Sequence, residues 1–454
     1  MLVRFSAENF LSIKERLEFS LIKGNGTTHS NHILPAKNYN DVSVLRSAII
    51  YGANASGKSN LIKAIAFSKE FILNGVKPDR PIPRQPFILD TSSSSKPSRF
   101  EFEIKINENI YAYGFEINNK QVLEEWLFLT GKRKENLIFE RKSLDKKEIT
   151  FCFEDNVDKS EQTFIQKLSE SVQMNKLLLT ELGVRDIPAL TQIKNIYNWF
   201  QKQLVIILPD TKVNGIEFSL EKDKELESSL TELLKFFDTG ITGIELIELD
   251  FVKDIQDIPE DIKQSLLEDM KNGDRVMIPS LAGIRYALYR DLNKIKAYKL
   301  MTKHTVTDGT NKEESINFEI KQESEGTQRL IDLIPALIML QKSNKVIFVD
   351  ELDRSLHPML SQAMIKRFFE LCNSNNGSQL IITTHESSLL SLKTFRKDEI
   401  WFVEKSERGE SKAYSLQDFN PRYDKDIRKG YLQGRFGAIP FIHNVKELGW
   451  TKVK

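Results

Sequence analysis

The feature that most constrains this chain is the segment Gly52-Ala53-Asn54-Ala55-Ser56-Gly57-Lys58-Ser59. It matches the pattern G-x-x-x-x-G-K-[ST] in full. An apolar run over residues 47–51 precedes it and indicates a buried strand, and residues 59–73 follow with helical spacing. The glycines allow a tight loop whose backbone N–H groups, with those of the helix start, point into one hollow. The segment therefore predicts a phosphate cradle between a strand and a helix.

Each residue type in this cradle has an expected task. Lys58 is expected to neutralise the β- and γ-phosphate oxygens of ATP, and the Ser59 hydroxyl is expected to bind Mg²⁺. We therefore predict ATP and Mg²⁺ as cofactors. The residues expected to contact the nucleotide here are Asn54, Ala55, Ser56, Gly57, Lys58, Ser59 and Asn60.

A second segment supplies carboxylates. The apolar run Val346–Val349 predicts a buried strand, and Asp350 and Glu351 follow it directly. This order is typical of a Walker B strand. Asp350 is expected to hold the Mg²⁺ shell, while Glu351 is expected to act as the general base that polarises the attacking water. Alone, two acids at a strand end also fit a solvated terminus, and their place after the cradle favours the catalytic role.

The segment Glu323-Ser324-Glu325-Gly326-Thr327-Gln328-Arg329 opens a predicted helix over residues 327–340. At this point the sequence resembles the ABC ATPases of the SMC, RecF and OLD kind, whose signature is L-S-G-G-Q. Ser324 and Gly326 match the serine and the second glycine of that signature, whereas Glu325 and Thr327 depart from it. The resemblance implies that Ser324 and Gly326 bind the γ-phosphate of a nucleotide held by another subunit. Ser324 on its own also fits an ordinary helix cap.

The same resemblance assigns three further positions. His385 ends the predicted strand Leu380–Thr383 and is similar to the switch histidine that contacts the γ-phosphate. Residues 353–358 follow the acids where the family has its D-loop, and His357 is expected to be an interface or capping residue. Gln85 is the one candidate for the glutamine that senses magnesium, on position alone.

Hydrophobic patterning outside these motifs predicts the α/β class. We expect an ABC-type P-loop ATPase head with a mixed or antiparallel N-terminal sheet, a mostly parallel core sheet and a helical insertion. An N-terminal hairpin is expected up to Ile22, and a second hairpin is expected to turn at Asn118-Asn119. The predicted boundaries are 1–155 for the first half of the head, 156–300 for a mainly helical insertion and 301–454 for the second half.

Composition limits the class of protein. Lys plus Arg number 65 and Asp plus Glu number 64, so the net charge of +1 gives no global attraction to nucleic acid or anionic lipid. Basic segments at Lys132-Arg133-Lys134, Arg141-Lys142 and Lys146-Lys147 leave local contact with nucleic acid open. Cys152 and Cys372 lie far apart, which favours a reducing compartment. No run has the length of a signal peptide or a membrane span, so we expect a cytoplasmic protein.

More narrowly, the opening Val3-Arg4-Phe5 through Glu8-Asn9-Phe10, the acidic segment 350–358 and the close at Gly434–Phe441 resemble the bacterial AAA-ATPase-like proteins typified by RloA. Relatives include the ATPase components of the anti-phage systems AbiL, Septu and PARIS. The resemblance implies a sensor ATPase that controls a separate effector, often a Toprim-like nuclease. The carboxylates after His385 are scattered, so we expect no nuclease within the chain.

The resemblance also implies a homodimer or higher homo-oligomer, because ABC heads complete each ATP site with the signature of a second head. ATP would close such a clamp and hydrolysis would open it. Two alternatives stay open. One is a DNA-maintenance ATPase of the RecF or SMC kind that binds duplex DNA directly, and the other is a nucleotide-gated scaffold that hardly turns over.

Overall fold

The computed structural model describes residues 1–39, 41–131, 134–143, 148–210, 216–221, 223–281, 283–292, 294–307, 312–371, 377–422 and 426–440. The chain forms two compact units, each built from separate stretches of sequence. The first unit comprises Met1–Pro209, Ser343–Leu352 and Phe369–Lys454, and the second comprises Asp210–Lys342 and Asp353–Phe368. The phosphate cradle, residues 52–59, and the acids Asp350 and Glu351 therefore lie in the first unit, and the signature segment, residues 323–329, lies in the second.

The first unit contains an antiparallel sheet of seven strands, in the order β10-β9-β8-β7-β6-β1-β2. Its strands are β1 (Leu2–Glu8), β2 (Leu17–Ser20), β6 (Ser98–Ile106), β7 (Asn109–Ile117), β8 (Val122–Thr130), β9 (Glu135–Lys142) and β10 (Glu148–Phe151). The predicted N-terminal hairpin is confirmed, since β1 pairs antiparallel with β2. The predicted turn at Asn118-Asn119 is also confirmed, because it joins β7 to β8.

The same unit contains a sheet of six strands, in the order β11-β17-β18-β5-β19-β20, and it is parallel except where β19 meets β20. The strands are β5 (Ser47–Tyr51), β11 (Leu204–Ile207), β17 (Val346–Val349), β18 (Gln379–Thr383), β19 (Ile400–Lys405) and β20 (Ser411–Ser415). Every residue of β5, β17 and β18 is buried, as expected for central strands covered on both faces. A pair β3 (Ile33–Leu34) and β4 (Val44–Leu45) completes the strands of this unit.

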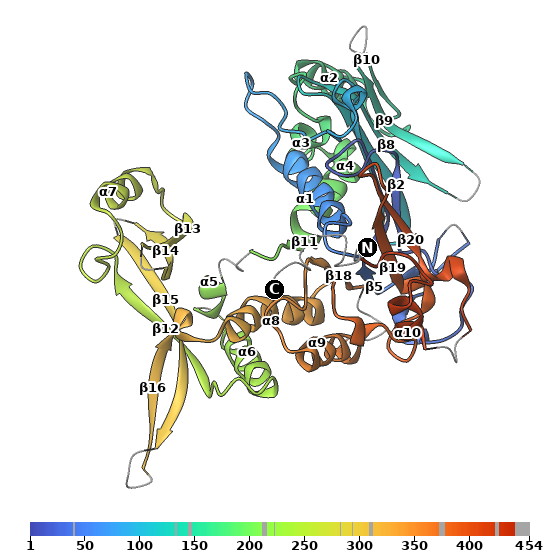
Figure 1. Cartoon of the computed structure of the whole chain (residues 1–454). Helices are drawn as coiled ribbons and strands as arrows, with labels where there is room; N and C mark the ends of the chain where they lie inside the picture. Colours follow the sequence, from blue (N-terminus) through green and yellow to red (C-terminus); the bar gives the residue numbers. More distant parts are fainter. Residues whose placement is uncertain are drawn as a thin grey trace, which may run out of the picture. The chain divides into compact units, whose positions relative to one another are not determined.

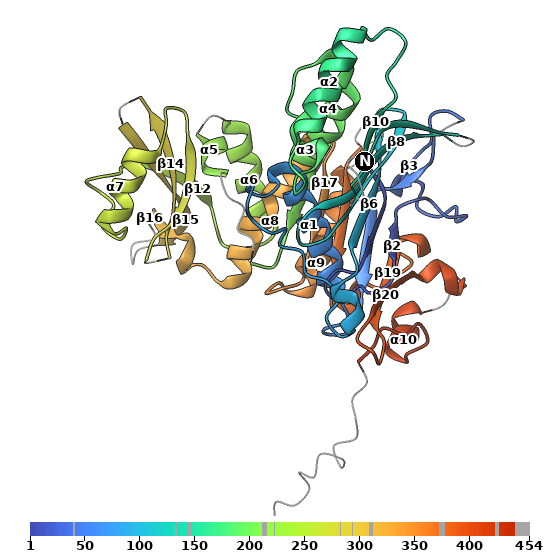
Figure 2. The same cartoon turned by 90° about the horizontal axis from the view of Figure 1, so that it is seen from above.

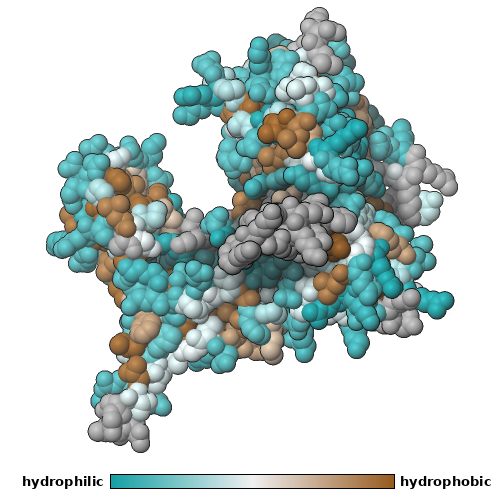
Figure 3. Space-filling view, in the orientation of Figure 1, coloured by the Kyte–Doolittle hydropathy of each residue, from teal (hydrophilic) through white to brown (hydrophobic). Residues whose placement is uncertain are grey.

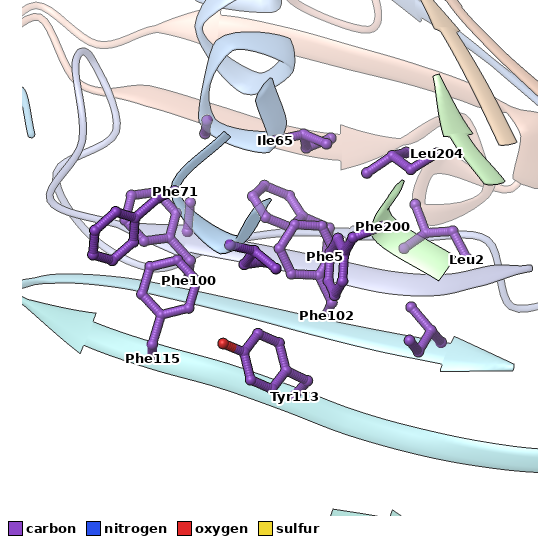
Figure 4. Packing of buried hydrophobic residues seen from close by; sticks show 14 of the residues in the cluster. Leu2, Phe5, Ile65, Phe71, Phe100, Phe102, Tyr113, Phe115, Phe200 and Leu204 are labelled. Carbon is purple, nitrogen blue, oxygen red and sulfur yellow. The ribbon is translucent and has the colours of Figure 1, made fainter. Parts of the chain in front are cut away.

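Helix α1 (Lys58–Asn74) packs its apolar side against the antiparallel sheet. Figure 4 shows Ile65 and Phe71 of this helix above aromatic side chains of the sheet. Phe5 and Phe102 lie with ring centroids 4.7 Å apart, and Phe102 meets Phe200 edge to face at 5.0 Å. Since large aromatic side chains remove much apolar area from water, this core fixes α1, and with it the loop that precedes it. The other helices of the unit are α2 (Lys159–Ser171), α3 (Leu178–Leu182), α4 (Thr191–Asn198) and α10 (Ile427–Leu432).

The second unit has its own core and a sheet of five strands. The strands are β12 (Gly243–Asp250), β13 (Arg275–Pro279), β14 (Arg285–Asp291), β15 (Lys294–Thr307) and β16 (Glu313–Glu319). In Figure 1, β15 and β16 form a long ribbon at one end of this sheet, and Figure 2 shows the same strands from above. The helices are α5 (Ile216–Leu220), α6 (Lys224–Phe236), α7 (Glu260–Asp269) and α8 (Glu325–Lys342), and α9 (Pro358–Leu371) lies mostly in this unit.

The predicted α/β class, with an antiparallel N-terminal sheet and a mostly parallel core sheet, is confirmed. The predicted boundaries at 155 and 300 differ from those of the compact units. The segment 156–300 contains helices, as expected, but also β11, β12, β13, β14 and the first half of β15. Residues 244–250 read Ile-Glu-Leu-Ile-Glu-Leu-Asp, which lacks the strict alternation that predicts a strand, so the sequence pattern did not indicate β12.

The exposed residues and the helices bear on the predictions made from composition. In Figure 3 hydrophilic residues predominate on the face shown, and hydrophobic ones occur in small separate groups. No helix among the described residues is both long and apolar enough to cross a bilayer. Arg141 is fully buried and donates to the Lys176 carbonyl at 2.8 Å, so this residue does not provide the local contact with nucleic acid that the sequence left open. The predicted basic residues Lys132, Arg133, Lys146 and Lys147, and Cys372, lie outside the described residues.

Candidate functional site

The phosphate cradle has the backbone that its sequence requires. Residues 52–57 connect β5 directly to α1, and Gly57 lies at a φ of 111° just before the first helical residue. Ala55 also has a positive φ, 61°, which a non-glycine residue adopts at an energetic cost. Lys58 is 5% exposed, and its Nζ donates to the carbonyls of Gly52 at 2.8 Å and Ala53 at 3.1 Å. The ammonium group is thus folded back over the hollow of its own loop.

Two serines that the sequence analysis did not assign to the site, Ser12 and Ser411, hold the phosphate-cradle loop through hydrogen bonds. The Ser411 hydroxyl of β20 lies 2.6 Å from the Ser56 carbonyl and 2.7 Å from the Ser12 hydroxyl, and Asn60 Nδ2 donates to Ser12 Oγ at 2.7 Å. A Cβ added at Gly57 would lie 2.1 Å from Ser411 Oγ. The glycine is therefore needed both for its φ and for this close approach. Nothing in the spacing of Ser411, far along the chain, signals this role.

The carboxylates follow β17 as predicted, and a threonine holds them. Asp350 is 1% exposed, and the Thr383 hydroxyl at the end of β18 donates to its Oδ1 at 2.6 Å. The Glu351 N–H donates to Thr383 Oγ1 at 2.8 Å. Glu351 lies at a φ of 52°, in the left-handed region, and its side chain is partly exposed. Strained backbone of this kind gathers at functional sites because the surrounding structure holds it in place.

Sheet topology brings the three predicted segments to one edge. The strands β17, β18 and β5 are neighbours and parallel, with Val349 beside Ile382 and Thr383 beside Ile50. The carboxyl ends of parallel strands meet at the same edge of a sheet. The cradle after β5, the two acids after β17 and His385 after β18 therefore lie at a common edge. His385 is exposed there, and the preceding residue Thr384 is fixed by its N–H bond to the Ile50 carbonyl at 3.1 Å.

The candidate magnesium-sensing Gln85 is tied to the same region through its backbone. Its carbonyl accepts from the Leu11 N–H at 2.7 Å, one residue before the serine that supports the cradle, and its side chain is exposed. Lys14 further holds this loop, since its Nζ lies 3.0 Å from Asp90 and 3.3 Å from Glu410. Hydrogen bonds from Ser92 and Lys14 lower the pKa of Asp90 to about 2, so this link is charged at neutral pH. The metal role of Gln85 stays a prediction.

The signature segment belongs to the second unit. Ser324 is exposed and caps α8: its Oγ accepts from the Thr327 N–H at 3.1 Å and lies 2.9 Å from the Thr327 hydroxyl. The departure from glutamine at position 327 thus provides a partner for the serine. The preceding Glu323 is held by His304 of β15, at 2.7 Å, and by the Thr302 hydroxyl. The sheet of the second unit therefore anchors the residue next to the signature serine.

Gly326 is required where the signature meets the D-loop segment. A Cβ at this position would lie 2.7 Å from the Ser355 carbonyl oxygen, which is backbone and has little freedom to move. Ser355 itself lies at a φ of 60°, and its hydroxyl lies 3.4 Å from Glu325 Oε2. His357, predicted as an interface or capping residue, caps α9, because its Nδ1 accepts from the Met359 N–H at 3.3 Å. The interface role is untested.

The residues present fit a magnesium nucleotide. The Ser56 hydroxyl, in a residue only 3% exposed, has no hydrogen-bond partner within the part of the chain that is described, and it lies inside the loop beside Gly52. Lys58 already places its ammonium group over the hollow that an anion would fill. Ser59 and Asp350 are hydroxyl and carboxylate ligands of the kind that Mg²⁺ takes together with phosphate oxygens. No group of three or more His, Cys, Asp or Glu residues among those described could hold a metal by itself.

Comparison with models of known protein families shows which family the chain belongs to. Residues 47–391 match the family model described as "AAA domain, putative AbiEii toxin, Type IV TA system". Since this match covers more than half of the chain, the protein belongs to that AAA-domain family.

Among solved structures, the chain is similar to an SMC head bound to the C-terminal winged-helix domain of ScpA, with 13% identity, a TM-score of 0.40, and coverage of 92% of this chain and 99% of the other. It is also similar to the SMC head domain of Thermotoga maritima, with 12% identity, a TM-score of 0.36, and coverage of 91% and 98%. No curated protein matches the sequence.

Proposed function

We propose that this protein is a cytoplasmic ABC-type ATPase that binds and hydrolyses ATP between two copies of itself and controls a separate effector protein. The observation that carries the proposal is the common edge of the parallel sheet. There the cradle with Lys58, the acids Asp350 and Glu351, and His385 all end neighbouring strands. This is the arrangement that phosphoryl transfer needs, because the reaction depends on positioning and charge stabilisation more than on covalent chemistry.

The side chains have distinct tasks in this proposal. On ATP binding, the Lys58 ammonium exchanges the Gly52 and Ala53 carbonyls for phosphate oxygens, which are stronger acceptors. Glu351 accepts the proton of the attacking water, and His385 donates to the γ-phosphate. When bound, Mg²⁺ neutralises charge on the phosphates, and Ser59 and Asp350 are the residues that would hold it.

The dimeric clamp is supported by the signature segment. Ser324 is exposed at the start of α8, and the start of a helix favours an anion. A second copy that presented this helix start to the nucleotide would complete the site. Loss of the γ-phosphate would then remove the bridge and part the two copies.

The proposed role in defence against phage rests on the family. The description of the family names a putative toxin of a type IV toxin–antitoxin system, and we propose that this protein restrains such a toxic partner. An ATP-timed clamp is suited to such restraint, because it has two states that nucleotide sets. We propose a Toprim-like nuclease as the effector, carried by a separate chain.

The proposal is tested first by nucleotide binding. Lys58→Ala should weaken ATP affinity by about tenfold or more, equivalent to about 1.4 kcal/mol, because the charge-assisted bonds to phosphate are lost. Lys63→Ala changes an exposed lysine of the same helix and should leave affinity unchanged. Titration of each variant with a fluorescent ATP analogue and Mg²⁺ provides the measurement. Equal affinities in both variants would refute a phosphate-binding cradle.

A further inference from the structure

Thr383 lies at the end of β18 and connects both catalytic carboxylate positions, although no motif marks it. Its side chain is fully buried. Its hydroxyl has one proton to donate and lone pairs that accept. The proton goes to Asp350 Oδ1 at 2.6 Å, and the oxygen accepts the Glu351 N–H at 2.8 Å. The threonine therefore uses both capacities of one hydroxyl on two adjacent residues.

The backbone of the same threonine adds a third connection. The Thr383 carbonyl accepts from the Leu352 N–H at 3.0 Å, so residues 350, 351 and 352 are all bonded to this one residue. This clamp lies where the chain leaves β17 and turns through Glu351 at a φ of 52°. A non-glycine residue holds that conformation only when its surroundings impose it. The hydrogen bond to the Glu351 N–H is one such constraint.

The directions of its two hydrogen bonds show that the Thr383 hydroxyl links Glu351 to Asp350. The series from the Glu351 N–H through Thr383 Oγ1 to Asp350 Oδ1 is continuous, and bonds in such a series strengthen one another at low local dielectric. Threonine is branched at Cβ, and this restricts its χ1 rotation within a strand. The hydroxyl is therefore held in place before any ligand arrives. Valine would preserve the shape and remove both bonds.

We propose that Thr383 is a positioning residue for ATP hydrolysis, which aims the Asp350 carboxylate and the Glu351 side chain through one buried hydroxyl. This inference rests on the proposed ATPase function. It concerns the chemical step and not the grip on the nucleotide, because Thr383 contacts neither the cradle lysine nor its loop in any described hydrogen bond. Removal of the hydroxyl should therefore lower kcat and leave ATP affinity nearly intact.

The experiment compares Thr383→Val, Thr383→Ser and wild type in the full chain with Mg²⁺ and ATP. Thr383→Val should lower kcat by about 10- to 100-fold, as expected when a residue that orients a catalytic group is lost, with KM changed by less than about threefold. Thr383→Ser keeps the hydroxyl and should stay within about threefold of wild-type kcat. Equal kcat for the valine variant and wild type would overturn the inference.

A matched control separates positioning from stability. Thr180 of α3 is also buried, and its hydroxyl donates to the Ile72 carbonyl at 2.8 Å. Thr180→Val should lower the melting temperature without lowering kcat. If Thr383→Val does not fold, Thr383→Ala and Thr383→Ser pose the same question, with the serine variant expected to be active and the alanine variant impaired. Inactive wild type would count against the proposed function, whereas active wild type with active hydroxyl-free variants would count against Thr383 alone.

Discussion

At the scale of single residues, the candidate site gathers backbone conformations that most sequences avoid. Ala55, Glu351 and Ser355 all have positive φ without being glycine, with values of 61°, 52° and 60°. Ala55 and Glu351 belong to motifs expected to meet the nucleotide, and Ser355 lies in the segment 353–358, where the family has its D-loop. Such conformations each cost about 1–3 kcal/mol and persist where the surrounding structure fixes them. Their place in these motifs is consistent with geometry selected for ligand binding and catalysis at the expense of local stability.

Glu351 offers the sharpest test of the chemistry. Glu351→Gln retains size and the backbone bond to Thr383 but removes the group that accepts a proton. Phosphate release at saturating ATP should fall by about 10²- to 10³-fold, the range expected for loss of a general base. ATP affinity should be unchanged. Glu407→Gln, at an exposed position after β19, is the matched control and should hydrolyse ATP like wild type. Unchanged turnover in Glu351→Gln would favour a scaffold that does not use this base.

Sequence alone indicates those candidate residues of this site that directly follow a recognisable local pattern. Lys58, Asp350, Glu351 and His385 are recognised because each directly follows a turn or a strand that shows its own pattern. The residues that hold them are different. Ser12 and Ser411 contact each other at 2.7 Å across 399 positions, so no local spacing signals the pair. Contacts of this kind depend on tertiary packing, which a single sequence does not reveal.

At the scale of secondary-structure elements, the start of α8 shows why one glycine of the signature remains. In a helix, alanine is favoured over glycine by about 1 kcal/mol. At Gly326 the Ser355 carbonyl occupies the space that a methyl group needs. The close approach of these two segments therefore outweighs helix propensity. The sequence could indicate that Gly326 matches a signature position, but not that packing against the D-loop segment requires it.

Gly326→Ala should lower stability and impair ATP-driven association together. Its Cβ would lie 2.7 Å from the Ser355 oxygen, so backbone must shift, at a cost of about 1–3 kcal/mol. Gly243→Ala is the control in the same unit, because the nearest atom to its Cβ is 3.5 Å away on a flexible lysine. Thermal unfolding should show a lower Tm for the first variant only. A Tm at or above wild type for Gly326→Ala would contradict the packing argument.

The strands of the second unit include some that sequence patterns alone did not predict. Residues 243–250 and 285–291 form β12 and β14 without a strict alternation of apolar and polar residues, and helices α6 and α7 flank β12 closely in sequence. These segments therefore show no clear strand period in the sequence. The antiparallel pairs of β15 with β12, β14 and β16 resolve the ambiguity through contacts between strands. The sheet of the second unit therefore depends on pairing between its strands more than on the intrinsic strand preference of each segment.

At the scale of the whole molecule, the question is whether one ATP site needs two copies. The cradle lies in the first compact unit and the signature in the second. Under the proposed clamp, each site takes Lys58 from one copy and Ser324 from the other. Lys58→Ala removes the cradle charge, and Ser324→Arg places a bulky side chain at the exposed helix start. Each variant alone would then form only damaged sites.

A mixture of the two variants should recover activity that neither has alone. In a heterodimer, the intact cradle of the Ser324→Arg copy meets the intact signature of the Lys58→Ala copy, and the other site carries both changes. Random pairing makes about half of the dimers mixed, each with one good site in two, so phosphate release should approach about a quarter of the wild-type rate. The rate should depend on the mixing ratio and peak near equal amounts. A mixture no more active than its components would mean that hydrolysis does not use a site shared between copies, because only a shared site lets each variant supply what the other lacks.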